Sequence, residues 1–196
     1  MPPVVATPNI LVDPGFLWVA PLGTAAPTNT VTASKFTDTV AAAWLPLGAT
    51  TEGSTFSYST EVEAINVAEF FDPIKYVTTG RSGNISFALA NFTLTNYRRA
   101  LNGGVAAIAP TGTGGSELAT LEPPDPGNEV RCMVLWESTD ATVRLMLRQT
   151  IQGGEVSVAM QKAPAIASIP CTFNMETPLG AAKPWVMWSA GADRAA

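Results

Sequence analysis

Along much of this chain, apolar and polar residues alternate with a period of two, the pattern of a β-strand whose two faces meet different surroundings. The clearest run begins at Ser54. One face of that run carries Phe56, Tyr58, Thr60 and Val62, and the other carries Ser57, Ser59, Glu61 and Glu63. We therefore expect a strand there with one buried face and one solvated face.

Further strands are expected where short apolar or alternating runs lie between clusters of Gly, Pro, Asn and Asp. These runs span residues 16–22, 44–50, 85–90, 129–137, 141–150, 155–162, 168–176 and 184–190. The links 138–140 and 152–154 are short enough for hairpins. About nine strands in one chain predict a mainly β fold, a sandwich or a barrel.

One helix is expected among these strands, laid against the sheet. Asn91 or Thr93 can serve as its N-cap, and apolar residues at i, i+3 and i+7 from Leu94 form one face. The Asn-Gly-Gly at residues 102–104 ends it. The pattern predicts about three turns.

Two connections are long for a compact domain. The first spans residues 64–82 and is too apolar for a solvated linker, since it carries Val67, Phe70, Phe71, Ile74 and Tyr76. These side chains pack either on a satellite core of their own subunit or on a neighbouring subunit. The second, residues 105–128, is rich in Gly and Pro and is expected to be a flexible excursion.

The composition fits a single domain over residues 1–196, with an N-terminal arm over about residues 1–14. Only 14% of the residues are charged, which is typical of a surface that neighbouring chains cover. The net charge is −5, and the longest basic run is the pair Arg98 and Arg99, which disfavours tight binding to nucleic acid. The start of the chain lacks the pattern of a signal peptide, and no apolar run has the length of a membrane span, so a soluble, non-exported protein is expected.

Little in the sequence points to catalysis. The chain has no His, the commonest general base and metal ligand, so no enzyme activity, metal or cofactor is expected. The Gly-rich residues 111–116 lack the Lys of a phosphate-binding loop. Glu61 and Glu63 have the spacing of a carboxylate pair, but a solvated acidic face is the simpler interpretation.

The Cys and Trp residues are assigned mainly to packing. Cys132 and Cys171 each lie in a strand-like run and are expected to be buried free thiols, with a disulfide as the alternative. Most of the five Trp are expected in the core, with a sugar-stacking platform as the alternative. Trp185 and Trp188, close to the C-terminus, are candidate interface anchors.

Several segments, taken in succession, resemble the major tail tube proteins of long-tailed bacteriophages with non-contractile (siphovirus-type) tails. These are Gly-Phe-Leu-Trp-Val-Ala-Pro-Leu-Gly-Thr at 15–24, Trp-Leu-Pro-Leu-Gly at 44–48, Thr-Glu-Gly at 51–53, and Thr-Gly-Arg at 79–81. The order of the elements matches over residues 14–190. Each segment is a packing or turn signature rather than a reactive group.

The resemblance implies a β-sandwich-like or barrel-like subunit with one flanking helix and long inter-subunit loops. Such subunits form hexameric rings that stack into a tail tube, through which genomic DNA is delivered without specific binding. The partners implied are further copies of the chain, a tape-measure protein, the tail tip and a tail terminator, with no membrane insertion. The implied location is the phage tail, after assembly in the host cytoplasm.

The resemblance also assigns roles to named residues. The loop at 64–82, with the five apolar residues named above, becomes a contact between subunits and successive rings. Ser57, Ser59, Glu61 and Glu63 are candidates to face the lumen, where small polar and acidic groups suit DNA transit. Alternatively, Arg144 and Arg148 pair with these glutamates between subunits. Two other functions remain open: a carbohydrate or host-surface binding module, and a head decoration or head–tail connector protein.

Overall fold

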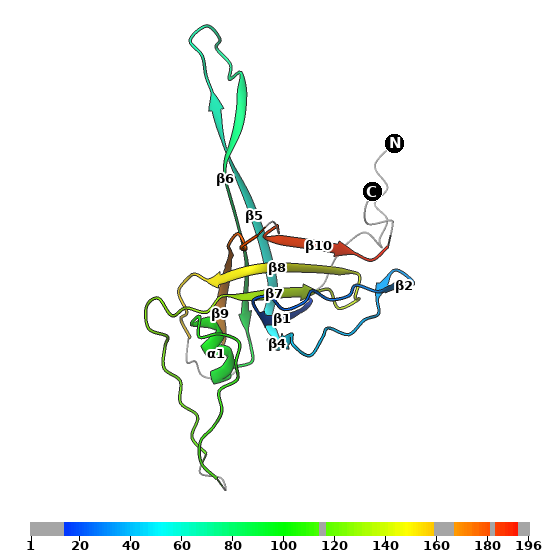
Figure 1. Cartoon of the computed structure of the whole chain (residues 1–196), viewed down its shortest axis with the longest axis vertical. Coiled ribbons are helices and arrows are strands. Elements are labelled where there is room, and N and C mark those ends of the chain that lie inside the picture. The colour runs from blue at the N-terminus through cyan, green and yellow to red at the C-terminus, as the bar shows by residue number, and fades with distance from the viewer. Residues whose placement is uncertain (1–13, 114–116, 159–166, 181–182, 192–196) are drawn as a thin grey trace.

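A computed structural model describes residues 14–113, 117–158, 167–180 and 183–191 (Figure 1). Most of the predicted N-terminal arm lies outside this part of the chain. The described elements are β1 (Phe16–Pro21), β2 (Val31–Thr32), β3 (Lys35–Phe36), β4 (Leu45–Pro46), β5 (Thr50–Ile65), β6 (Lys75–Leu89), α1 (Leu94–Ala100), β7 (Cys132–Glu137), β8 (Val143–Gln152), β9 (Ile169–Met175) and β10 (Trp185–Ser189). The predicted mainly β fold with one helix is confirmed.

The strands form one antiparallel eight-stranded sheet, and a separate β2–β3 pair lies beside it. The order along the large sheet is β4-β1-β7-β8-β9-β6-β5. The long strand β8 joins the sheet's two parts, because its first half pairs with β10 and its last residues pair with β9. In Figure 1, β1, β7, β8 and β10 run across the molecule, whereas β5, β6 and β9 run along its long axis. The bend between the two parts lets one face of each cover the other.

The main core fills the space inside this bend. Its buried side chains alternate along the strands: Leu17, Val19, Val134, Trp136, Leu145 and Leu147 come from one part, and Ile85, Phe87, Leu89, Ile169, Cys171 and Phe173 from the other. The rings of Phe87 and Phe173 stack with centroids 5.8 Å apart. Each such side chain stabilises the fold by about 1.5–3 kcal/mol through removal from water.

A second, smaller core covers the opposite face of β1, β7 and β8. It contains Ala20, Trp44, Met133, Leu135 and Met146. The chain between β1 and β4 covers it, and the indole of Trp44 donates to the carbonyl of Ala25 over 3.0 Å. Strands β7 and β8 are therefore buried on both faces, which explains why residues 132–136 are apolar without alternation.

A buried arginine holds the covering segment to the sheet. The side chain of Arg144 is 1% exposed and forms ion pairs with Asp38 (2.9 Å) and Glu137. Its guanidinium also lies 4.5 Å from the ring centroid of Phe36. The interpretation that Arg144 pairs with Glu61 or Glu63 of another subunit is wrong, because this cation is enclosed and paired within its own subunit.

The helix is shorter than expected. Thr93 is the N-cap, and its hydroxyl accepts from the backbone N–H of Asn96 over 3.1 Å. The seven residues of α1 make about two turns rather than three. Asn102 takes a left-handed conformation (φ 58°), and the N–H of Gly103 donates to the carbonyl of Arg98, which closes the helix early.

The segment predicted as a long connection over residues 64–82 is instead a hairpin, and this expectation is wrong. Strand β5 continues to Ile65, and β6 starts at Lys75 directly opposite. Only residues 66–74 form the connecting loop. Cross-strand pairing extends both strands through residues whose local pattern predicts no strand.

Other expected elements shorten or disappear. The strand expected over 44–50 is reduced to β4. Residues 155–158 form no strand, and 159–162 lie outside the described residues, so 152–154 is not the predicted hairpin link. The excursion 105–128 has no helix in its described residues, as expected, and one bridge joins Thr111 to Leu118.

Both cysteines are buried free thiols, as predicted. Burial raises the pKa of the Cys132 thiol to about 11. Burial, together with the nearby Cys132, raises the pKa of the Cys171 thiol to about 12. Because the thiolate is the reactive form, both side chains are unreactive near neutral pH.

Candidate assembly surfaces

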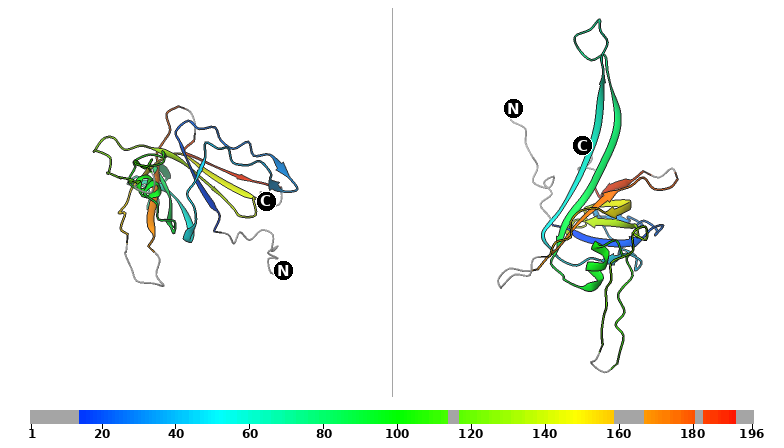
Figure 2. Two further views of the ribbon diagram at one scale, coloured as in Figure 1. Left: turned by 90° about the horizontal axis from the view of Figure 1, so that it is seen from below. Right: turned by 90° about the vertical axis from the view of Figure 1, so that its left-hand side faces the viewer.

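The β5–β6 hairpin projects from the body as a long arm (Figures 1 and 2). We define the arm as residues 58–81 and its tip as residues 66–74. Beyond Phe56, the apolar side chains on the arm are largely open to solvent: Tyr58, which contacts Trp185, is 40% exposed, Val62 58%, Phe70 64% and Phe71 fully exposed. The predicted buried face of the run from Ser54 is therefore wrong beyond Phe56, because the hairpin leaves the body there.

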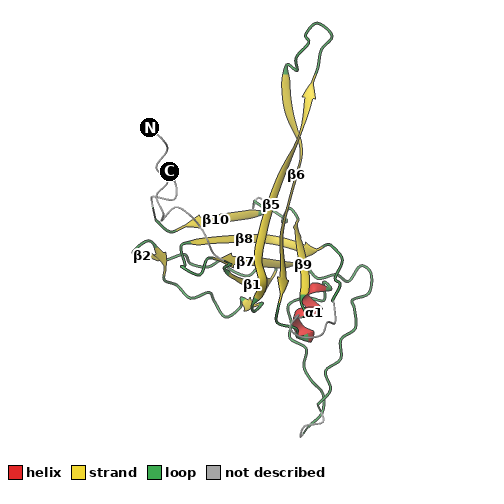
Figure 3. Cartoon of the chain, turned by 180° about the vertical axis from the view of Figure 1, so that it is seen from behind, coloured by secondary structure: helices red, strands yellow, loops and turns green. Residues whose placement is uncertain are grey.

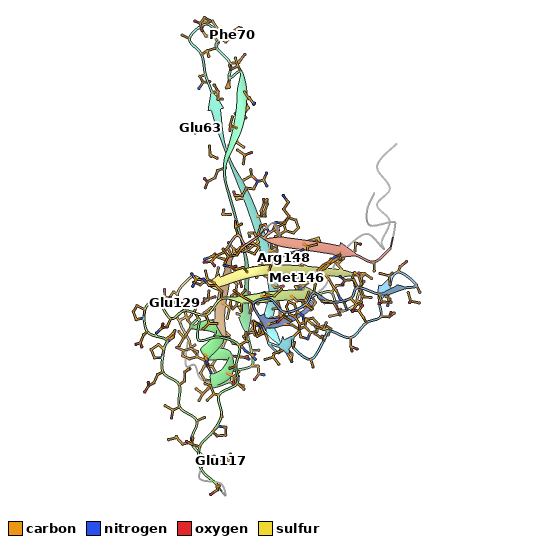
Figure 4. The ribbon with its side chains drawn as sticks, in the orientation of Figure 1. Glu63, Phe70, Glu117, Glu129, Met146 and Arg148 are labelled. Carbon is orange, nitrogen blue, oxygen red and sulfur yellow. The ribbon has the colours of Figure 1, made fainter. Side chains whose placement is uncertain are left out.

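The five apolar residues predicted in the long loop all lie on or beside the tip. Val67 is half-buried, whereas Ile74 and Tyr76 are 56% and 63% exposed, and Phe70 and Phe71 are more exposed still. The interpretation as a satellite core of the same subunit is therefore wrong. Figure 4 shows Phe70 at the far end of the arm, where no other part of the described chain approaches. These side chains form an apolar surface without a partner in the subunit.

The register of the hairpin places Ser57, Ser59, Glu61 and Glu63 on one face of β5, and all four are exposed. Their direct partners on β6 are Asn84, Ser82, Gly80 and Val77. Figure 4 shows Glu63 well out along the arm. Neither Glu61 nor Glu63 forms an ion pair with any residue in the described ranges. Sequence reasoning brought the four residues together correctly, on one strand.

The same face continues across two further strands. Ser57 pairs with Asn84, which pairs with Asn174, and Thr55 pairs with Ser86, which pairs with Thr172. We call this surface of β5, β6 and β9 the polar face. The alternation over residues 85–90 and 168–176 was visible in the sequence, but the sequence did not show that these strands are neighbours.

An anchored carboxylate lies at the edge of the polar face. Glu176, directly after β9, accepts hydrogen bonds from Gln149 (2.8 Å) and Arg131 (3.1 Å). These two hydrogen bonds hold the pKa of Glu176 below its ordinary value. Arg131 is thus neutralised locally, and the unpaired charges of Glu61 and Glu63 leave the polar face net negative.

Strand β5 is the last strand of the sheet. It pairs with β6 on one side, and in the part of the chain that the structure describes no strand pairs with its other side. The strand has 16 residues, whereas β4, at the opposite end of the sheet, has only two. A long open edge of this kind is a template for pairing with another chain.

The two C-terminal tryptophans pack within the subunit while keeping part of their surface open. The ring of Trp185 packs edge-on against two rings of β5, with its centroid 5.5 Å from that of Phe56 and 5.6 Å from that of Tyr58. Trp188 packs beside the smaller core. Trp44 and Trp136 are buried, and the other three are half-buried, so the row of open Trp rings expected of a sugar-binding platform is absent from the described structure.

The described residues contain no group of three or more His, Cys, Asp or Glu side chains placed to hold a metal ion.

Within the same residues, no helix has the length and apolar character needed to span a bilayer.

An open edge, an uncovered apolar arm and an extended polar face are typical of a structural protein that associates with other chains. Comparison with family models agrees: the model for phage tail tube proteins matches residues 9–190, and the chain belongs to this family. A comparison with curated proteins finds no match. The protein is thus a structural component of a phage tail, and it self-assembles into a tube together with other tail components.

Proposed function

We propose that the chain forms hexameric rings that stack into the tube of a non-contractile tail, and that genomic DNA passes through the bore. The observation that carries this proposal is the polar face beside the open edge of β5. In the body, one face of β6 and β9 packs in the core, and the other carries half-buried Ser, Thr and Asn side chains. On the arm, β5 extends this face with the exposed side chains of Ser59, Glu61 and Glu63.

Ring closure uses the edge of β5. A sheet closed by strands from several subunits has no free edge, which removes the site of uncontrolled pairing. The 16 residues of β5 provide backbone donors and acceptors for a strand of the adjacent subunit. Since β5 pairs with β6, and β6 with β9, closure at this edge joins the polar faces of adjacent subunits into one surface.

In this arrangement the polar face lines the bore. Small uncharged side chains offer DNA phosphates no cation, so they cannot hold the phosphates strongly, and Glu61 and Glu63 repel them. The lumen residues are therefore the four predicted ones, Ser57, Ser59, Glu61 and Glu63, extended by Ser82, Asn84, Ser86, Thr172 and Asn174.

The arm makes the contacts between rings. Val67, Phe70, Phe71, Ile74 and Tyr76 become buried against a subunit of the adjacent ring, which removes their apolar surface from water. The open parts of Trp185 and Trp188 lie at contacts between subunits. Rings polymerise around a tape-measure protein from the tail tip in the host cytoplasm, and a terminator protein closes the tube.

The first experiment is negative-stain electron microscopy with light scattering on the purified protein, alone and with its tail-tip complex. Hollow tubes of uniform width are expected. A protein that stays monomeric under both conditions would contradict the assembly proposal.

The lumen assignment is tested by the double substitution Glu61→Lys and Glu63→Lys. Tubes should form normally, whereas DNA delivery should fall because the phosphates bind the new cations. The matched control is Glu117→Lys with Glu122→Lys, which makes the same charge change on the excursion. Equal infectivity of the two double variants would contradict the assignment.

A further inference from the structure

A pocket of about 500 Å³ lies where the arm leaves the body. Its walls come from β5, β6, the end of β9 and the start of β10, and we call it the root pocket. Pockets that hold a specific group typically measure roughly 300–1,000 Å³. The root pocket is thus large enough for bulky side chains.

The root pocket has a mixed lining, in which Tyr58, Met175 and Trp185 supply aromatic and apolar surface beside charged and polar groups. Tyr58 and Trp185 contact each other edge-on with ring centroids 5.6 Å apart, and both line the pocket. The methyl group of Met175 lies over Gly83, where an added Cβ would come within 2.0 Å of it. A glycine at this position therefore leaves room for the Met175 methyl group at the pocket wall.

Two of the residues that line the pocket are cationic. Arg81 and Lys183 are both exposed, and neither forms an ion pair within the described ranges. Glu176 also lines the pocket, but its carboxylate already accepts from Arg131 and Gln149. The pocket thus combines aromatic walls with two unpaired positive charges.

The tip of the arm has the complementary chemistry. Residues 69–72 read Glu-Phe-Phe-Asp, and all four are exposed. Phe70 is 64% exposed and Phe71 fully exposed. Aromatic side chains that enter a pocket are the usual energetic centre of an interface, and opposite charges at the rim orient the approach.

We propose that the tip of one copy docks in the root pocket of a second copy. Phe70 and Phe71 then lie against Tyr58 and Trp185, and Glu69 and Asp72 lie beside Arg81 and Lys183. This inference rests on the proposed function, because it names the surface that the arm contacts. A contact between the tip of one copy and the pocket of another joins two different surfaces and is therefore heterologous. The same contact can then repeat from ring to ring.

The occupant cannot be the tip of the same chain. The seven steps from Tyr58 to Ile65 carry the strand about 23 Å away from the pocket, and Figures 1 and 3 show the arm extending outward from the body. Two other pockets among the described residues fit the tip less well. The pocket beside Phe16 and Trp18 has no cation, and in the pocket beside α1 Arg98 already donates to Gly103, while Glu122 would repel the tip.

Cross-linking between two separately made variants tests the docking. One variant carries Asp72→Cys and the other Lys183→Cys. The two proteins are mixed under conditions in which tubes assemble, and the mixture is treated with a short bis-maleimide. A covalent dimer can then form only between copies, and the buried native thiols give little background. We expect a strong dimer band from this mixture and none from Asp72→Cys mixed with Glu117→Cys, whose second site lies at the opposite end of the molecule (Figure 4).

Tubes without the dimer, or equal dimer in both mixtures, would overturn the docking while leaving the tube proposal intact. If no tubes form but the dimer appears selectively between soluble chains, the tube proposal fails and the docking holds. If neither tubes nor dimer form, the docking is overturned as well.

Charge reversal provides a second test. Lys183→Glu should slow tube growth, followed by light scattering, by about ten-fold, because the rim would repel the acidic tip. Adding Asp72→Lys in the same chain should restore growth. A single variant that grows at the normal rate, or a double variant no faster than the single one, would overturn the charge pairing.

Discussion

The body strands β7 and β8 and the arm strands β5 and β6 are antiparallel hairpins that meet different surroundings. Side chains of β7 and most of β8 are buried on both faces, whereas those of the arm are exposed on both. A two-stranded hairpin alone is marginally stable in water, so the arm depends on its continuity with the body and on partners. Body residues should therefore control folding, and arm residues should control association.

The largest effect is expected at the buried cation of the body. Arg144→Ala leaves Asp38 and Glu137 without their counter-ion and should reduce the free energy of unfolding by about 3–5 kcal/mol. Urea unfolding followed by tryptophan fluorescence measures it. Arg81→Ala, which removes an exposed arginine of the arm, is the control and should change stability little. Equal losses of unfolding free energy in the two variants would contradict the distinction between body and arm.

A cavity in the main core should have the next largest effect. Leu147 is fully buried, so Leu147→Ala should cost about 2–5 kcal/mol. Leu179→Ala deletes the same atoms from a fully exposed side chain and should cost less than about 0.5 kcal/mol. Denaturant midpoints of the two variants give the comparison, and similar midpoints would contradict the assigned burial.

Acid should weaken the body through Asp38. Burial alone would raise the pKa of this carboxyl, but the hydrogen bond and charge of Arg144 outweigh it and hold the pKa below 3.8. A lowered folded-state pKa contributes stability above pH 3.8, and this contribution disappears as the pH falls through the folded value. Stability measured against pH should therefore decline below about pH 4, and less steeply in Asp38→Asn. The same slope in both proteins would contradict the coupling.

The smallest effect on folding is expected at the arm tip. Phe71→Ser should change the free energy of unfolding of the isolated subunit by less than about 0.5 kcal/mol, because the ring contacts little in its own chain. The same variant should fail to form tubes in electron microscopy. Phe92→Ser, at an exposed aromatic outside the arm, should assemble normally. Strong destabilisation of the subunit by Phe71→Ser would show that the tip packs within its own chain.

Local signals predicted most of the body. The alternation of Ile85, Phe87 and Leu89 and the apolar run at 132–136 gave strands where the structure has them, and one of the two predicted N-cap candidates, Thr93, caps the helix. Cys132 and Cys171 are buried as their surroundings suggested. These features were predictable because they depend on residues close together in the chain.

The predictions that were wrong concern features that depend on residues far apart in the chain. Strand β5 runs on to Ile65 because Lys75 pairs with it, and no local pattern shows that partner. Arg144 was a candidate to pair with a glutamate of another subunit, but the segment holding Asp38 covers it. For the candidate surfaces, Ser57, Ser59, Glu61 and Glu63 were found from one strand, whereas Asn84 and Asn174 joined them only through pairing.

The sequence by itself determined a mainly β protein, its helix cap, its buried thiols and an apolar segment in need of a partner, because periodicity, capping and composition are local properties. Only the tertiary structure decided that this segment is an arm, that the polar residues of three strands form one face, and that a pocket lies at the arm's root. The physical reason is that burial depends on which strands pair and what covers them, and both are set by contacts between residues far apart in the chain.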